Sequence, residues 1–289
     1  MNPIIMHINY CEQGQTIDEV CRNAAKWGYD GIEFRAKVPD KFDSREAYVA
    51  EIKRCCEKHG LKHIHFGYMF DGSSNDDESV RDAAVADAAG FFKLVNRELG
   101  VNLCNLFMDL CVKEGGSRWD FDNNGSAAAS ERNFQNNVDT LKKLNVHLEK
   151  MDFYLALETH MNYIHDLALP TRKFVDALGK SNIGINIDYC NNRHMKGIKP
   201  LAETIDIYGD KLYYFHLKNS VKPFDSDLWF CVALSQGEIN HRELLKIMRD
   251  RGYTDCPIVI EAPRDGDREF YAQEDIKYLK WLINDLKLN

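Results

Sequence analysis

Four side chains that can bind a metal ion stand at the ends of four apolar segments. They are Glu158, Asp188, His216 and Glu261, which close the runs Phe153–Glu158, Ile183–Asp188, Leu212–His216 and Pro257–Glu261. Each run has the length and apolar character of a buried strand. If the runs are neighbouring strands of a parallel barrel, the four side chains converge at its C-terminal rim, where such barrels carry their active sites. Three carboxylates and one imidazole there form a ligand set for one divalent cation.

Strand-like and helix-like segments alternate along the whole chain. We expect strands to begin near residues 4, 31, 61, 101, 153, 183, 212 and 256. Residues 78–99 and 138–148, and the segment from Ile276 to Leu286, carry apolar side chains at steps of three and four, as amphipathic helices do. Eight strand–helix units of about 30 residues each predict a single (β/α)8 TIM barrel over residues 1–289, with eight parallel strands inside and helices outside.

The predicted helix ends carry local signals. Thr16–Glu19 and Asn240–Glu243 match the capping-box pattern of a helix start. Glycine supplies the left-handed residue that often ends a helix, and it stands at four predicted ends, at Gly28, Gly60, Gly100 and Gly252.

Three longer gaps follow predicted strands, at residues 67–77, 107–130 and 218–236. Because they follow strands, we expect them to be long loops on the catalytic face, where they would form lids and substrate-binding walls. Three aromatic residues in these loops either stack on a sugar or anchor loops and subunit contacts: Trp119, Phe121 and Trp229. The rival fold, a doubly wound open sheet, should carry a Gly-rich phosphate turn after an early strand, and the sequence has none.

Composition narrows the classes of partner. Lys and Arg number 37 and Asp and Glu number 45, which gives a net charge of 37 − 45 = −8 and argues against a nucleic-acid surface. The nine cysteines are scattered without a C-x-x-C pair, as expected for reduced thiols in a cytoplasmic protein. The N-terminus lacks a signal-peptide pattern, and no apolar run approaches the length of a membrane span. We therefore expect a cytoplasmic protein that binds a small molecule and neither nucleic acid nor membrane.

Short motifs near the strand ends follow one another in a characteristic order. They are Gly28-Tyr-Asp-Gly-Ile-Glu33, Leu155-Ala-Leu-Glu158, Asp188, His216-Leu-Lys218, Gly237-Glu-Ile-Asn240, Gly252-Tyr253 and Ile258-Val-Ile-Glu261. Each motif is weak alone. In order and spacing together they resemble the xylose-isomerase-like TIM-barrel superfamily of sugar isomerases and epimerases, and the resemblance covers nearly the whole chain.

The resemblance implies a role for each of the four rim residues. Glu158, Asp188, His216 and Glu261 are expected to bind one divalent metal ion, most commonly manganese in the family, with magnesium, cobalt and zinc as alternatives. Glu158 and Glu261 are also the expected catalytic pair: one removes a proton next to a carbonyl and the other returns one, while the metal stabilises the enediolate. This is the chemistry of a sugar or polyol isomerase or epimerase in carbohydrate metabolism.

Three positions depart from the ketose 3-epimerases of this superfamily. Those enzymes carry a His, a Glu and an Arg where this chain has Asn191, Ile164 and Lys222. The His216-x-Lys218 pair is closer to the isomerase and inosose-dehydratase branches.

Other functions remain as alternatives. One is a lyase or dehydratase on the same scaffold, after the same proton abstraction, and only product analysis separates it from an isomerase. An apurinic-site endonuclease is disfavoured, because its three zinc ions need further histidines and because the chain is acidic. A non-catalytic barrel is disfavoured by the intact ligand set. The sequence leaves open whether the chain forms a homo-oligomer.

Further rim residues are candidates for substrate binding. His160 and Lys218 each lie two positions after a ligand, so strand alternation places them on the same inward side. His65 is near the end of the third strand, Asn191 follows Asp188, and Arg264 follows Glu261. For each there is a structural alternative, such as a core-edge histidine at His65, a surface lysine at Lys218, or an ion pair between Arg264 and Glu261. We also expect Glu33 and Arg35 to pair with each other below the site.

Overall fold

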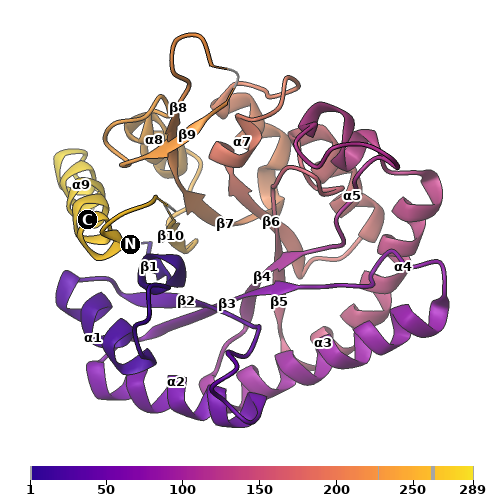
Figure 1. Cartoon of the computed structure of the whole chain (residues 1–289), viewed down its shortest axis with the longest axis horizontal. Helices are drawn as coiled ribbons and strands as arrows, with labels where there is room; N and C mark the ends of the chain where they lie inside the picture. The colour runs from indigo at the N-terminus through magenta and orange to yellow at the C-terminus, as the bar shows by residue number, and fades with distance from the viewer. Residues whose placement is uncertain (1, 227, 262–263, 289) are drawn as a thin grey trace.

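Eight short strands pair in parallel to form a closed barrel in the computed structural model, which describes residues 2–226, 228–261 and 264–288 (Figure 1). The strand order is β1-β10-β7-β6-β5-β4-β3-β2. The barrel strands are β1 (Ile4–His7), β2 (Gly31–Arg35), β3 (His63–Met69), β4 (Leu103–Phe107), β5 (Tyr154–Glu158), β6 (Ile183–Asp188), β7 (Leu212–Leu217) and β10 (Ile258–Ile260). The predicted (β/α)8 TIM barrel is confirmed.

Helices surround the barrel on all sides (Figure 1). The helices are α1 (Ile17–Trp27), α2 (Arg45–His59), α3 (Glu78–Leu99), α4 (Glu131–Leu148), α5 (Ala168–Leu178), α6 (Tyr189–Asn192), α7 (Leu201–Tyr208), α8 (His241–Asp250) and α9 (Arg268–Asp285). Short 3-10 turns lie at η1 (Ile8–Cys11), η2 (Phe121–Asn123), η3 (Gly125–Ala127), η4 (Glu149–Met151) and η5 (Gly209–Lys211). None of the helices in the described ranges combines the length and apolar character that crossing a membrane requires.

The barrel has two apolar layers because its strands are covered on both sides. Outward-facing strand residues and the inner faces of the helices form one large core cluster. A smaller cluster inside the barrel contains Ile5, Ala156, Tyr214 and Val259. These side chains fill the interior, as expected for a barrel that is a packed core and not a pore. The polar site therefore lies above an apolar layer.

The local signals at the helix ends act largely as predicted. Thr16 and Glu19 form a complete capping box at the start of α1. At α8, the Asn240 side chain accepts the backbone N–H of Glu243. Three of the predicted end glycines are left-handed C-caps, at Gly28, Gly60 and Gly100. Gly252 also has a positive φ, two residues after the end of α8. All nine cysteines are free thiols, and six of them are buried.

Two of the predicted rim loops contain more regular structure than expected. Strand β3 continues to Met69, into the segment 67–77 that we expected to be loop. The segment 218–236 contains an antiparallel hairpin of β8 (Asn219–Val221) and β9 (Phe230–Val232). The Asn219 side chain fixes the base of the hairpin by donating to the carbonyls of Leu234 and Ile239. Strands of three residues are too short to give a period-two pattern in the sequence.

Candidate metal centre and active site

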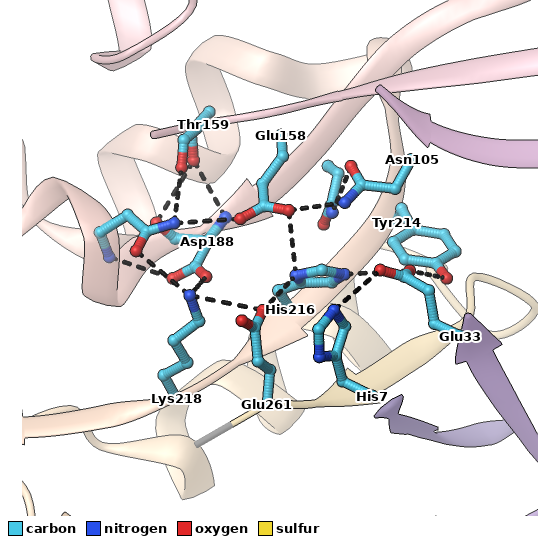
Figure 2. A network of polar contacts seen from close by, with 12 residues as sticks. His7, Glu33, Asn105, Glu158, Thr159, Asp188, Tyr214, His216, Lys218 and Glu261 are labelled. Atoms are coloured by element: carbon cyan, nitrogen blue, oxygen red, sulfur yellow. Dashed lines mark hydrogen bonds and ion pairs between the residues drawn. The ribbon is translucent and has the colours of Figure 1, made fainter. Parts of the chain in front are cut away.

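The four predicted ligands lie together at the C-terminal rim (Figure 2). Glu158, Asp188 and His216 lie on the neighbouring strands β5, β6 and β7, and Glu261 directly follows β10, the strand beside β7. One ligand atom from each residue lies within 4.8 Å of the others. This convergence follows from the topology, because neighbouring parallel strands end at the same rim.

The His216 imidazole lies between the ligand carboxylates and a further buried glutamate. Its Nδ1 atom is 3.0 Å from Glu261 Oε2 and 3.2 Å from Glu158 Oε2. Its Nε2 atom is 3.2 Å from Oε2 of Glu33, which is fully buried and also accepts the Tyr214 hydroxyl at 2.5 Å. Burial acts to lower the pKa of His216, but Glu158 and Glu33 raise it well above the usual value, and Nε2–H donates to Glu33. A bound cation would replace the proton on Nδ1, the nitrogen that faces the ligand carboxylates. A carboxylate behind a histidine is a common arrangement in metal sites, where it fixes the imidazole tautomer.

Two buried atoms in this cluster lack a hydrogen bond of good geometry. They are His216 Nδ1 and Asp188 Oδ2. Asp188 Oδ2 lies 2.9 Å from Lys218 Nζ, so the two charges attract, but the contact is not a well-directed hydrogen bond. Unsatisfied buried polar atoms are costly and rare. Both atoms are good ligands for a divalent cation, and the oxygen-rich donor set with one imidazole fits such an ion.

Asparagine side chains hold the two glutamates in place. Glu158 accepts hydrogen bonds from Asn105 Nδ2 at 2.6 Å and from Asn191 Nδ2 at 3.1 Å, one on each oxygen. Glu261 Oε1 accepts from Asn9 Nδ2 at 3.1 Å. These hydrogen bonds fix the orientation of the Glu158 and Glu261 carboxylates, so that one oxygen of each lies close to the other ligand atoms.

Lys218 supplies a buried positive charge at the same place. Its Nζ atom lies 2.9 Å from Asp188 Oδ2 and 3.4 Å from Glu261 Oε2, and it donates to Asn191 Oδ1 at 3.3 Å. Only 7% of the Lys218 side chain is exposed, which such a charge tolerates only when anions surround it. The nearby carboxylates raise its pKa well above the usual value, although burial acts in the opposite direction.

The environments of the two glutamates push their pKa values apart. Burial raises the pKa of Glu158 to about 8, with the His216 charge opposing it. Burial also acts to raise the pKa of Glu261, but Lys218 and the neighbouring histidines hold it well below the usual value. For Glu33, His216 outweighs the effect of burial and lowers the pKa to about 2. Two neighbouring carboxyls of which one has a raised pKa and the other a lowered pKa, as Glu158 and Glu261 have, are typical of acid–base sites.

A cleft of about 870 Å³ opens over the cluster and reaches past the ends of β2 and β3 to α3. His7, Glu33, Glu158, Lys218 and Glu261 line its inner end. Three rings form one wall, with centroid separations of 5.4 to 5.8 Å: Phe107, His160 and Tyr163. The cleft therefore gives access to the cluster across the β2–β5 part of the rim.

The predicted substrate-binding residues fall into two groups. His160 and Lys218 line the cleft, and Asn191 contacts both Glu158 and Lys218 beside it. His65 and Arg264 are not among the residues that line the cleft. His65 is buried inside the barrel with its ring against Tyr214, one layer below His216, at a centroid distance of 5.4 Å.

Arg264 faces a different part of the molecule. Its guanidinium is bonded to the buried Asp275 at 2.6 Å and lies over the Tyr271 ring at 4.1 Å. The alternative that Arg264 pairs with Glu261 is also not observed, because Glu261 contacts Asn9, His216 and Lys218 instead. Arg264 thus ties the last βα connection to α9.

The expected pair of Glu33 and Arg35 is wrong. Glu33 bonds His216 and Tyr214, whereas Arg35 forms a bidentate pair with Glu12 at the surface. Two residues further along a strand is a rise of about 7 Å. That distance carries Arg35 out of the buried layer into solvent, where a different partner is available.

The aromatic residues of the rim loops lie outside the cleft. Trp119 is 73% exposed and packs on Phe121, and Phe121 contacts His194. Trp229 lies 4.1 Å from the Arg193 guanidinium. These contacts favour the loop-anchoring alternative. The sequence reasoning instead missed His7, Asn9 and Asn105, of which only His7 gives a signal, as a polar residue that ends an apolar strand.

Comparisons with known proteins agree with this architecture. The family model described as xylose isomerase-like TIM barrel matches residues 21–282. A structure of D-psicose 3-epimerase with D-tagatose from Clostridium cellulolyticum H10 has a TM-score of 0.77 at 17% identity, covering 97% of this chain and 99% of that chain. The probable 3-DHS dehydratase AsbF, involved in petrobactin synthesis, from Bacillus anthracis has a TM-score of 0.72 at 18% identity, with the same coverage.

A third similar structure is the IOLI protein with a binding zinc atom. Its TM-score is 0.74 at 17% identity, and the match covers 98% of each chain. At these identities the similarity of all three structures shows the fold alone. Among curated proteins, none matches this sequence.

Proposed function

The chain belongs to the xylose isomerase-like TIM-barrel family, and from this premise we propose that it is a metal-dependent isomerase or epimerase that acts on a sugar or related polyol. The observation that carries the proposal is the cluster of four ligand atoms within 4.8 Å of one another at the inner end of a cleft. Proton abstraction next to a carbonyl needs a base, an acid and an electrophile. The two glutamates would supply the base and the acid, and the cation that the cluster would hold would supply the electrophile.

Glu158, Asp188, His216 and Glu261 would hold one divalent cation. We propose manganese, with magnesium, cobalt and zinc as alternatives, because the three carboxylates and one imidazole suit each of them. When bound, the cation polarises a carbonyl oxygen and neighbouring hydroxyl oxygens of the substrate.

The remaining steps belong to the side chains. Either Glu158 or Glu261 takes a proton from the carbon next to the carbonyl through a carboxylate oxygen, and the other returns a proton to the same or the adjacent carbon. Asn105 and Asn9 keep these carboxylates oriented. Lys218 Nζ donates to a substrate oxygen, and the rings of Phe107 and Tyr163 exclude water from one face of the sugar.

A lyase is the second candidate, and one observation favours it. The buried Lys218 ammonium lies 3.4 Å from Glu261 Oε2, so a proton-removing carboxylate and a cation for a developing oxyanion are neighbours. The same abstraction followed by loss of water or of a substituent would make the enzyme a dehydratase. Chromatography and NMR of the product separate the two reactions. Only the lyase product has lost water or a substituent, whereas an isomerase product keeps the composition of the substrate.

Exchange of a substrate carbon-bound hydrogen with deuterated water tests the proposal. A panel of ketoses, aldoses and inososes is incubated with metal-loaded protein, and deuterium incorporation is followed by NMR. We expect wild type to exchange one hydrogen next to the carbonyl. Glu158→Gln and Glu261→Gln should each lower the rate by at least about 10³-fold, because each removes a group that transfers the proton.

The metal content of each variant is measured in the same samples. A metal-replete Glu261→Gln protein with a near-normal exchange rate would show that the two-glutamate mechanism is wrong. Glu12→Gln, which changes a surface glutamate paired with Arg35, is the matched control and should keep the wild-type rate.

A further inference from the structure

The cleft extends well beyond the metal cluster, and α3 forms its far wall. Helix α3 has 22 residues, and its buried residues all lie from Val85 onward. The first two turns therefore project past the core and stand above the barrel rim. Four residues of α3 line the cleft: Val80, Ala83, Ala84 and Asp87. Their spacing of three and four places them on one stripe of the helix.

This stripe faces Met69 at the end of β3, and together they form the outer cleft, defined by Met69, Val80, Ala83 and Ala84. Met69 is 46% exposed and Val80 is 40% exposed. A ligand that covers apolar side chains at that exposure removes them from water, and this burial lowers the free energy of binding. Alanine at two of the four positions leaves room for a flat group.

The charges beside the outer cleft balance one another. Arg45 makes two hydrogen bonds of 2.8 Å to Asp87, and the Tyr68 hydroxyl donates to the same carboxylate at 2.8 Å. Two further charged residues line the cleft without an ion pair among the described residues, Lys37 and Asp71, and their charges are opposite. The outer cleft therefore offers no excess positive charge for a phosphate.

The size of the cleft also exceeds what one monosaccharide needs. At about 870 Å³, it lies in the upper part of the roughly 300–1,000 Å³ range of pockets that enclose drug-sized ligands. A single six-carbon ring on the cluster would leave the stripe of α3 uncovered.

We propose that the substrate is a glycoside that carries a carbonyl on its sugar ring and an aromatic substituent at its anomeric carbon. Its sugar lies at the inner end against Lys218 and the carboxylate cluster, and its aromatic group lies in the outer cleft on Ala83 and Ala84. The inference rests on the proposed function, since it assumes that the sugar is the part that reacts. It predicts that affinity comes from the apolar substituent as well as from the hydroxyls.

Matched glycosides test binding of the aromatic group apart from the reaction, because they lack the ring carbonyl and so cannot react. Dissociation constants of methyl and phenyl glycosides of D-glucose, D-galactose and D-xylose, in both anomers, are measured by NMR titration of the metal-loaded protein. For at least one sugar, we expect the phenyl glycoside to bind about ten-fold or more tightly than its methyl counterpart. Ala83→Glu, which puts a charge on the stripe, should remove that difference.

Ala86→Glu is the matched control, because Ala86 is exposed on the same helix but does not line the cleft. It carries the same added charge and should keep the preference for the phenyl glycoside. Equal melting temperatures of the two variants establish that both are folded. Equal affinities of phenyl and methyl glycosides, a phenyl preference that survives Ala83→Glu, or no binding of any probe would each overturn the inference.

The outcome also separates this inference from the proposed function. Deuterium exchange on free sugars without a phenyl preference would support the isomerase and overturn the aromatic subsite. A phenyl preference that depends on Ala83, in a protein that exchanges no substrate hydrogen, would support the subsite and overturn the isomerase.

Discussion

The two sides of the barrel rim are built on different principles. On the side of β5, β6, β7 and β10, and at Glu33, which reaches His216 from β2, charged groups are buried and each has several fixed partners. On the side of β2, β3 and α3, the ion pairs are half-exposed and apolar side chains face the cleft. The first side has the rigidity that a reacting centre needs. The second offers a surface that can differ between relatives without disturbing the chemistry.

This contrast predicts that metal affinity depends on buried partners and not on surface charges. Glu33→Gln should weaken binding of a divalent metal by about 10–100-fold, because Glu33 fixes the His216 tautomer through Nε2. Calorimetric titration of the metal-free protein measures the change. In cobalt-loaded wild type, NMR should also detect a shifted, slowly exchanging imidazole N–H, and this signal should exchange faster in Glu33→Gln.

Glu12→Gln is the control from the open side of the rim and should bind metal as wild type does. Equal metal affinities of Glu33→Gln and wild type would mean that the buried glutamate serves only the packing of the barrel, and the contrast between the two sides would lose its basis.

Arg264 tests where the site ends. Because it pairs with the buried Asp275, Arg264→Ala should lower the free energy of unfolding by about 2–3 kcal/mol, somewhat less than loss of a fully buried pair costs. Metal affinity should stay unchanged. Urea unfolding and metal titration of the same variant measure both effects. If the variant were as stable as wild type but had lost metal or substrate affinity, Arg264 would belong to the binding site after all.

The smallest effect is expected at the ion pair beside the outer cleft. Arg45→Met breaks a pair in which both side chains are more than a third exposed, so the unfolding free energy should fall by less than about 1 kcal/mol. Metal affinity should be unaffected. The comparison between the two sides would fail if this variant lost as much stability as Arg264→Ala or as much metal affinity as Glu33→Gln.

The barrel and the convergence of the four ligands could both be predicted from the sequence, for one physical reason. Strand ends in a parallel barrel share one rim, so a polar residue that closes an apolar run has only one place to be. The same rule reached His160 and Lys218, which lie two residues after Glu158 and His216. This rule predicts the location of a side chain wherever its position along one strand decides whether it lies at the rim.

The partners that orient the ligands could not be predicted in this way. Asn105 reaches Glu158 from the neighbouring strand β4, and Asn9 reaches Glu261 from η1, which follows the neighbouring strand β1. No local pattern marks an asparagine as a partner of a residue 53 or 252 positions away. The depth of His65 could not be predicted for a related reason, because alternation along β3 gives the side of the sheet but not the distance from the rim. The α3 wall depends on where the core ends beneath a helix, which periodicity alone does not reveal.

Metal binding by the four-residue cluster is the central claim, and elemental analysis tests it most directly. Wild-type protein and an Asp188→Asn/His216→Ala double variant are purified identically, stripped with chelator, reloaded with manganese and desalted before measurement. We predict about one manganese ion per chain in wild type and almost none in the variant, because the variant lacks two of the four ligands. Equal metal content in two folded proteins, or none in either, would contradict the account.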